Sequence, residues 1–386
     1  MRRGFLVGRL TVLLVTGFVM SAPLSGQSGA TRAPHVGEGG VPQFQADPAW
    51  PKLPAKWRLG HASAVAVDAQ DHVWILHRPR TLPPELRAQS APPVLEFDNA
   101  GNFIQGWGGP GEGYQWPENE HGLHVDYKGF VWVVGNAQPQ DGQILKFTKA
   151  GKLVMQIGKS GQTGGNATQF LKGAAGLRVD PATNELYVSD GYGNSRVMVY
   201  DAETGKFKRM WGAYGNTPLD AALRPKRAAP AQNPWPAVAE VLQQMNTVHD
   251  VAISNDGLVY VSDRGNKRIQ VFTREGKYVA QQFFGLDSPE YLQARSTAFS
   301  PDPAQQFLYV SGTPVIYIVN RQTLEILASF VTGSAQEHPP GHQITADANG
   351  NLYAVQAEQT GADGKSGGAG AQKFLFKGFS PRTTAP

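Results

Sequence analysis

The sequence predicts an all-β protein, a six-bladed β-propeller, and three observations lead to this prediction. A strand-pair pattern recurs six times between Ala64 and Ala354. The chain contains 45 Gly and 28 Pro, a composition that favours many turns over long helices. Its 386 residues exceed the usual size of one domain, about 100–200 residues, but a closed ring of repeats accommodates that length.

The recurring pattern is a short apolar strand that ends in Asp or Ser, a turn, and a second strand centred on an aromatic residue. Two clear copies are Leu123-His-Val-Asp126 before Phe130-Val-Trp-Val133, and Leu177-Arg-Val-Asp180 before Leu186-Tyr-Val-Ser189. Alternation with a period of two around a turn is typical of a β-hairpin. The first strands of the other four copies end at Asp68, Ser254, Ser300 and Asp347.

Third and fourth strands follow most of these hairpins. Arg268-Ile-Gln-Val-Phe272 is a third strand, and Gly276-Lys-Tyr-Val-Ala280 contains a fourth after a Gly turn. Four antiparallel strands that repeat at roughly 40–50 residues are typical of a propeller blade. We therefore expect the propeller to span residues 59–380. Two irregular stretches interrupt it: an insertion at 215–245, with a short helix near Pro236–Gln244, and a Gly-rich loop at Gln359–Ala371.

The first 58 residues lie outside the repeats. Residues 1–30 are typical of a signal peptide, because Arg2, Arg3 and Arg9 precede an apolar run from Leu10 to Met20 that is short for a membrane span. The alternative is an uncleaved anchor, and the Arg pair also fits a twin-arginine signal, so the export route stays open. Residues 31–58, rich in Pro, either supply a strand that closes the ring or cover it. We expect an exported protein, periplasmic or extracellular, with no membrane span after the signal is removed.

Composition excludes several classes of site. The chain has no Cys, which excludes disulfides, thiolate metal sites and a Cys nucleophile. The net charge of +4 includes three Arg of the signal segment, and no basic block indicates nucleic acid. We expect a monomer that binds a small molecule or a peptide.

Three histidines occupy equivalent positions of alternate blades. The residues five positions before the anchor Asp or Ser of each blade are, in order, Ser63, His121, Ala175, His249, Arg295 and His342. Innermost strands line a propeller's channel, so alternate members of this ring form a triangle around the axis. Three His with an open fourth position are typical of catalytic zinc, although imidazole also suits other divalent metals. The alternative is that each imidazole only forms hydrogen bonds at the channel mouth.

The other histidines do not follow this ring. His124 lies three residues after His121 on the same strand, so we expect its side chain to point to the opposite face and to be packed or hydrogen-bonded. The remaining histidines are interpreted as structural or surface residues; they are His61, His72, His77 and His338.

The chain resembles the NHL-type six-bladed propellers and, more narrowly, the peptidyl-α-hydroxyglycine α-amidating lyase family. Its most specific element is Asp190-Gly-Tyr-Gly-Asn-Ser-Arg196. The other segments that carry the likeness are Leu76-His-Arg78, His121-Gly-Leu-His-Val-Asp126, Val248-His-Asp-Val-Ala252, Ser262-Asp-Arg264 and Gly341-His-Gln-Ile344.

This resemblance implies roles for individual residues. The three ring histidines would bind zinc, Tyr192 would act as base or proton acceptor, and Arg78 would bind and polarise the substrate. Arg264 and Arg295 are further candidates for an anionic group of the substrate. A Tyr with a pKa near 10 is a poor base at neutral pH unless a cation stabilises its phenolate, and either zinc or Arg78 is placed to do so.

The chain departs from the family pattern at three places. Pro340 stands where the family has Met before its last zinc ligand, and Gly193 replaces a disulfide Cys. Gln343 stands where the family has an Asp that contributes to a structural calcium site, so calcium is not expected here. A different substrate is therefore consistent with the resemblance.

Three functions compete at this point. The first is a zinc-dependent lyase that cleaves the C–N bond of a carbinolamide. The second is a non-catalytic exported propeller that binds a protein, peptide or glycan, since a fold does not dictate a function. The third is a lactonase-like hydrolase, which the ring disfavours because such calcium sites use Glu, Asp and Asn rather than His.

Overall fold

Six four-stranded antiparallel sheets make up a six-bladed β-propeller, as the sequence predicted. The structure is a computed structural model that describes Met1 and residues 40–165, 168–223, 242–286, 294–333, 340–356 and 370–381. The chain divides into two units, Met1–His35 and Val36–Pro386, and every strand belongs to the second. Some of the sequence predictions fall on residues outside these ranges. They are the signal peptide after Met1, His338, most of the Gly-rich loop, and the helix near Pro236–Gln244 up to residue 241.

The first five blades are each built from four consecutive strands. Blade 1 contains β2 (His61–Val67), β3 (Val73–Arg78), β4 (Val94–Phe97) and β5 (Phe103–Trp107), and blade 2 contains β6 (Glu120–Val125), β7 (Val131–Gly135), β8 (Gln143–Phe147) and β9 (Leu153–Gly158). Blade 3 contains β10 (Ala174–Asp180), β11 (Glu185–Asp190), β12 (Arg196–Asp201) and β13 (Phe207–Trp211), and blade 4 contains β14 (Val248–Ile253), β15 (Val259–Asp263), β16 (Arg268–Phe272) and β17 (Tyr278–Phe283). Blade 5 contains β18 (Ser296–Phe299), β19 (Phe307–Ser311), β20 (Val315–Asn320) and β21 (Ile326–Val331).

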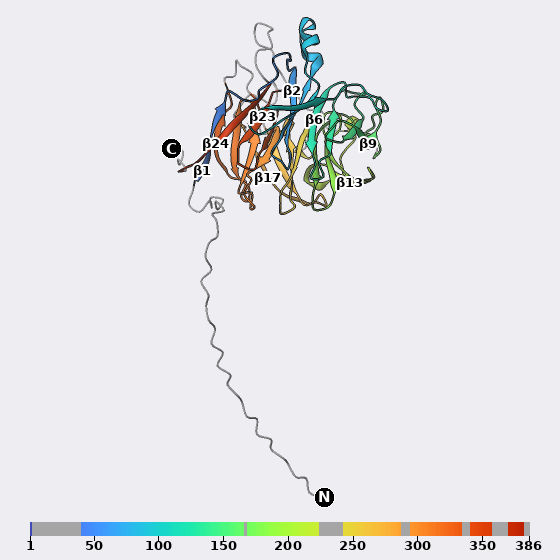
Figure 1. Cartoon of the computed structure of the whole chain (residues 1–386). Helices are drawn as coiled ribbons and strands as arrows, with labels where there is room; N and C mark the ends of the chain where they lie inside the picture. The colour runs from blue at the N-terminus through green and yellow to red at the C-terminus, as the bar shows by residue number, and fades with distance from the viewer. Residues whose placement is uncertain are drawn as a thin grey trace. The chain divides into compact units, whose positions relative to one another are not determined.

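Blade 6 joins the two ends of the propeller. It contains β22 (Gln343–Ala346), β23 (Leu352–Val355), β24 (Ala371–Pro381) and, as its outermost strand, β1 (Gly40–Asp47). β1 pairs antiparallel with β24, and Figure 1 shows the blue β1 beside the red β24. β1 comes from the Pro-rich segment 31–58. The ladder between β1 and β24 therefore ties the start of the propeller to its end.

Short 3₁₀ helices connect some of the strands. They are η1 (Pro79–Thr81), η2 (Pro84–Gln89), η3 (Ala213–Gly215), η4 (Ala221–Leu223) and η6 (Arg264–Asn266). Among the described residues, no helix is long and apolar enough to cross a membrane.

The repeated anchor Asp has a structural explanation. In blade 2, one Asp126 oxygen accepts the backbone N–H groups of Lys128 and Phe130, and the other accepts the indole N–H of Trp132 at 2.8 Å. Asp68 makes the same contacts with its own turn and with Trp74. The anchor thus satisfies the turn and the buried aromatic together, which explains why Asp and the aromatic recur at a fixed spacing.

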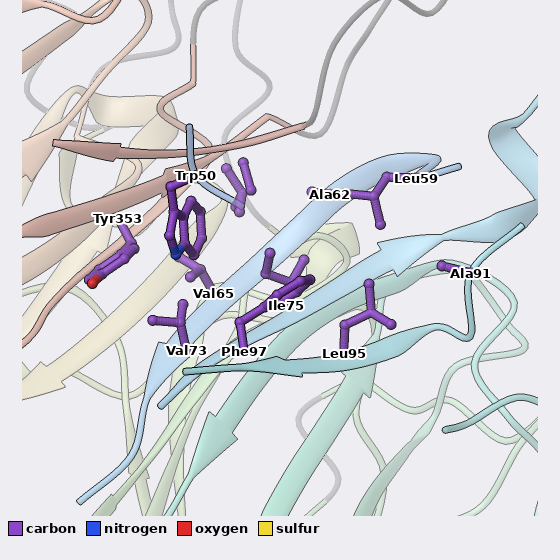
Figure 2. Close-up of a cluster of buried hydrophobic side chains, with 12 residues drawn as sticks. Trp50, Leu59, Ala62, Val65, Val73, Ile75, Ala91, Leu95, Phe97 and Tyr353 are labelled. Carbon is purple, nitrogen blue, oxygen red and sulfur yellow. The ribbon is translucent and has the colours of Figure 1, made fainter. Parts of the chain in front are cut away.

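The hydrophobic core lies between the blades. Each of six buried clusters contains residues from two neighbouring blades. One of these clusters joins blade 6 to blade 1. In that seam Trp50 packs against Tyr353 of blade 6, beside Val65 and Ile75 of blade 1 (Figure 2). The large apolar side chains therefore fill the seams between the blades.

The innermost strands meet around the axis. Each contacts the innermost strand of the next blade, in the order β2, β6, β10, β14, β18, β22 and back to β2. Corresponding positions of these strands therefore lie at one level of the channel.

Candidate metal centre

The ring of six predicted positions coincides with a break in strand register. In the first four blades the ladder between the first two strands slips by one residue at the ring position, as at β-bulges, and the residues concerned are Ser63, His121, Ala175 and His249. In the last two blades Arg295 and His342 directly precede the innermost strand and donate their backbone N–H to the neighbouring strand. A bulge re-aims a side chain relative to the regular alternation. At these four positions the bulge therefore interrupts the regular alternation of the strand.

His121, His249 and His342 lie together in the structure. Their ring centroids are separated by 5.0 Å (His121 to His249), 4.8 Å (His121 to His342) and 4.7 Å (His249 to His342). All three side chains are buried. Blades 2, 4 and 6 thus bring three imidazoles, far apart in sequence, onto the axis.

The other three ring members orient these imidazoles through their backbone. The Nδ1 atoms of His121, His249 and His342 lie 2.8, 2.8 and 2.7 Å from the carbonyl oxygens of Ala175, Arg295 and Ser63, respectively. A carbonyl only accepts hydrogen bonds, so each Nδ1 carries the proton and each Nε2 keeps its lone pair. The ring therefore alternates between a ligand and the carbonyl that fixes the ligand's tautomer.

Electrostatics keeps the three imidazoles neutral. Burial lowers the pKa of His121 well below 6.5, and the charges of Arg78, Arg264 and Arg295 lower it further. Burial likewise lowers the pKa of His249 and of His342 well below 6.5, with additional effects of Arg264 and Arg295 on the former and of Arg295 and Arg78 on the latter. Neutral imidazole is the form that binds a metal.

These residues fit a divalent metal ion. The three histidines offer ligand nitrogens that all lie within 4.8 Å of one another. The buried Nε2 of His249 has no hydrogen-bond partner among the described residues. A facial set of three imidazoles suits zinc and other first-row metals, with the choice among them left to geometry and availability.

Tyr192 lies at the edge of the triangle. Its hydroxyl is 2.9 Å from Nε2 of His121 and accepts a hydrogen bond of 3.1 Å from Nη1 of Arg264. Tyr192 follows β11, and Arg264 is the first residue of η6 after β15. The phenol oxygen therefore lies between a candidate ligand and a guanidinium.

The side chains of Arg78 and Arg295 lie close enough to the triangle for their charges to act on its imidazoles. Arg78, the last residue of β3, donates from Nε to the carbonyl of Glu120 at 2.7 Å. Arg295 donates from Nη1 to the hydroxyl of Thr313 at 2.9 Å. The effect of both charges on the histidine pKa values shows that they act at the same centre.

The remaining histidines have partners of their own. His77 is buried between the backbone N–H of Gly60 and the carbonyl of Pro92, and burial lowers its pKa to about 4. His124 accepts a hydrogen bond of 3.2 Å from Nη1 of Arg178 on its Nδ1. His61 begins β2 and pairs with Arg78 across the ladder.

A second group of potential ligands consists of Asp68, His72 and Glu96. His72 Nδ1 lies 2.7 Å from Glu96, and the Lys149 ammonium lies 2.6 Å from Asp68. Lys149 already supplies the positive charge that a cation would bring, so the triangle is the stronger metal candidate.

Residue 343, next to His342, is a Gln and has no carboxylate that could bind calcium. Gln343 is buried, and the buried carboxylate on the equivalent level belongs instead to Asp250, which accepts a 2.6 Å hydrogen bond from Ser296. The chain therefore offers an amide rather than a carboxylate at the position next to His342.

Two features of the site were not foreseen from the sequence. The orienting carbonyls belong to Ser63, Ala175 and Arg295, and backbone groups leave no mark on residue type. Arg264 contacts Tyr192 directly, whereas the sequence analysis suggested only contact with a substrate anion. The ion pair beside that turn joins Asp263 and Arg268 at 2.7 Å.

Known proteins resemble this chain over most of the propeller. A family model described as "NHL repeat" matches residues 245–272, which contain β14, β15 and β16. NHL repeat-containing protein 3 of Mus musculus is 29% identical over 306 residues, which are 76% of this chain and 72% of that protein.

Two further relatives carry amidating-enzyme names. Peptidyl-glycine alpha-amidating monooxygenase B of Xenopus laevis is 28% identical over 243 residues, 61% of this chain but only 25% of that protein. A probable peptidyl-alpha-hydroxyglycine alpha-amidating lyase of Caenorhabditis elegans is 28% identical over 154 residues, 40% of this chain and 36% of that protein. The chain is thus a six-bladed propeller that contains one match to the NHL-repeat model, and it is similar to amidating enzymes over only part of their length.

Proposed function

We propose that this protein is an exported, metal-dependent lyase that cleaves the C–N bond of a carbinolamide of the peptidyl-α-hydroxyglycine type. The products would be an amide and glyoxylate. The observation that carries the proposal is the triangle of neutral, oriented imidazoles with the Tyr192 hydroxyl 2.9 Å from one of them. The name of one partial relative, a probable peptidyl-alpha-hydroxyglycine alpha-amidating lyase, agrees with this reaction.

His121, His249 and His342 would hold the metal through their Nε2 atoms. A bound divalent ion polarises an oxygen of the substrate and stabilises negative charge on it. The carbonyls of Ala175, Arg295 and Ser63 keep the three Nε2 lone pairs directed at one point, so little reorganisation accompanies binding.

Tyr192 is the proposed proton acceptor. In the reaction the carbinol O–H loses its proton, the C–O bond becomes a carbonyl, and the C–N bond breaks with its electron pair moving to nitrogen. The phenol oxygen of Tyr192, as phenolate, takes the carbinol proton, and the same oxygen then returns a proton to the leaving amide nitrogen. Arg264, 3.1 Å from that oxygen, stabilises the phenolate before the transfer.

The guanidinium groups give the site affinity for an anion. Arg78, Arg264 and Arg295 all lower the pKa of His121, so positive potential converges on the triangle. A substrate carboxylate next to the carbinol carbon fits this potential, and a planar guanidinium binds a carboxylate well.

The test is glyoxylate release from N-benzoyl-α-hydroxyglycine by purified protein whose zinc content has been measured. We expect turnover by the zinc-loaded protein. Tyr192→Phe should keep its zinc and lose about 10²–10⁴-fold in kcat, because it removes only the proton acceptor. Absence of turnover with zinc demonstrably bound would overturn the lyase proposal.

The competing function is a non-catalytic propeller that binds a protein, peptide or glycan. It would be favoured by a purified protein without metal, and by a His121→Ala variant that still binds its partner. Export is tested separately, by comparing the N-terminal residue and cell fraction of the expressed protein with those of a variant lacking residues 2–30.

A further inference from the structure

A second candidate binding site lies in the channel, at the level of the anchor residues rather than of the triangle. A cavity of about 380 Å³ opens between the inner strands and turns of blades 4, 5 and 6. Its wall includes Ala252, Thr297, Ala298 and Thr345, and Arg178 reaches it from blade 3. This volume accommodates a small molecule.

Small side chains create this space. The residues two positions before each anchor share one level of the channel, and they are Ala66, His124, Arg178, Ala252, Ala298 and Thr345. His124 and Arg178 are the large residues at this level. The small residues Ala252, Ala298 and Thr345 line the cavity. This level of the channel therefore has small side chains along the cavity and one guanidinium, that of Arg178.

The guanidinium of Arg178 has a histidine, and no carboxylate at ion-pair distance, as its partner among the described residues. Its Nη1 donates to Nδ1 of His124 at 3.2 Å, and burial together with the charge of Arg178 lowers the pKa of His124 well below 6.5, so this partner is neutral. Within the described ranges, no carboxylate lies at ion-pair distance from Arg178. An arginine has five N–H donors, of which His124 takes one.

The nearby carboxyl groups already have hydrogen-bond partners. Asp347 lines the cavity, but its oxygens accept hydrogen bonds from Asn351, Tyr353 and Asn99. Asp250 accepts hydrogen bonds from the Ser296 hydroxyl and the Thr297 backbone N–H. Neither group neutralises Arg178 by direct contact.

Two buried polar atoms beside this guanidinium have no hydrogen-bond partner in the described part of the chain. They are the Oγ1 of Thr297, which lines the cavity, and the Nε2 of His124. Thr297 is 1% exposed and His124 is 8% exposed. Because Nδ1 of His124 accepts from Arg178, Nε2 carries the proton and is a donor. Buried polar groups normally have partners, and an acceptor in the cavity, either a water molecule or an anion, would satisfy the Thr297 hydroxyl.

We propose that this cavity binds a small oxyanion, a carboxylate or a phosphate, through Arg178, with the Thr297 hydroxyl as a further donor. Arg178 lies three residues after the ring position Ala175 on β10, which places the site about 10 Å along the axis from the triangle. The site is therefore separate from the metal centre, and its existence does not depend on the lyase proposal.

The test is calorimetric titration of the full-length, zinc-loaded protein with inorganic phosphate and, separately, with sodium acetate. We expect saturable binding of at least one probe that weakens about tenfold or more in Arg178→Gln and is partly restored in Arg178→Lys. The tighter probe identifies the class of anion. Arg264→Gln is the matched control, because it removes a guanidinium at the triangle and should leave this binding unchanged.

Two results would overturn the proposal. One is no saturable binding of either probe to the wild-type protein at up to about 10 mM. The other is binding that Arg178→Gln leaves intact while Arg264→Gln abolishes it, which would assign the anion to the metal centre. If Arg178→Gln does not fold, Thr297→Val replaces it, and unchanged affinity in that variant counts against the site.

Discussion

Protonation of the three histidines should contribute almost nothing to the pH dependence of zinc binding between about pH 8 and pH 6. The perturbation is the change in pH, applied to the metal-free protein. An ordinary imidazole with a pKa of about 6.5 is three-quarters protonated at pH 6, so three of them would release a little over two protons on binding zinc. The affinity of such a triad would fall about 70-fold relative to pH 8.

The structure leads to a different expectation. Burial and the charges of Arg78, Arg264 and Arg295 lower the pKa of His121 well below 6.5, and His249 and His342 shift in the same direction. A lowered pKa keeps an imidazole neutral at pH 6, so no proton has to leave before the metal binds. We expect release of fewer than about 0.5 proton, of which about 0.1 comes from zinc-bound water with a pKa near 7.

The assay is titration calorimetry at pH 6 in three buffers that differ in ionisation enthalpy. The slope of observed enthalpy against ionisation enthalpy gives the number of protons released. Circular dichroism of the metal-free protein at pH 6 checks that it is folded. Release of about two protons at pH 6 would refute the reasoning. So would a loss of affinity between pH 8 and pH 6 that clearly exceeds the change of about tenfold caused by ionisation of a zinc-bound water with a pKa near 7.

Three other predictions concern the metal ligands, the buried histidine of blade 1 and the anchors. His249→Ala should lose stoichiometric zinc by elemental analysis, whereas His72→Gln, outside the triangle, should keep it. Burial lowers the pKa of His77 to about 4, so unfolding takes up a proton between about pH 6.5 and pH 4. The free energy of unfolding therefore falls by about 1.4 kcal/mol for each pH unit as the pH drops through this window. In urea titrations His77→Gln should remove this contribution to the pH dependence of the free energy of unfolding, and an unchanged pH dependence would contradict the assignment. Asp126→Ala should cost about 1–3 kcal/mol in the same titrations, because it leaves the indole N–H of Trp132 buried without an acceptor, and a loss below about 0.5 kcal/mol would count against the role of the anchor.

The propeller could be predicted from the sequence because the repeat is a local signal. Each anchor Asp or Ser ends one strand and each aromatic centres the next, and alternation with a period of two places both on a hairpin. The strand limits were less accurate. In blade 1 the first strand was expected from Ala64 but begins at His61, since the bulge at Ser63 interrupts the alternation on which the prediction relied.

The triangle of histidines was predicted from spacing, whereas its chemistry depends on contacts between blades. Counting back from the anchors selected His121, His249 and His342 because sixfold repetition gives equivalent positions the same height on the axis. The contact of Tyr192 with Arg264 joins blades 3 and 4, and no feature of either segment predicts it. Neither the bulges nor the carbonyls that fix the tautomers are encoded in residue types at those positions.

The sequence by itself therefore determined the class of fold, the number of blades and the three residues that face one another on the axis. The tertiary structure decided which nitrogen of each imidazole is free, the neutral state of the triad, the position of the Tyr192 hydroxyl and the open cavity beside Arg178. The physical reason is the distance along the chain between the groups that decide each feature. Hairpins follow from side chains a few residues apart, whereas tautomers, pKa shifts and cavities depend on groups that ring closure brings together from different blades.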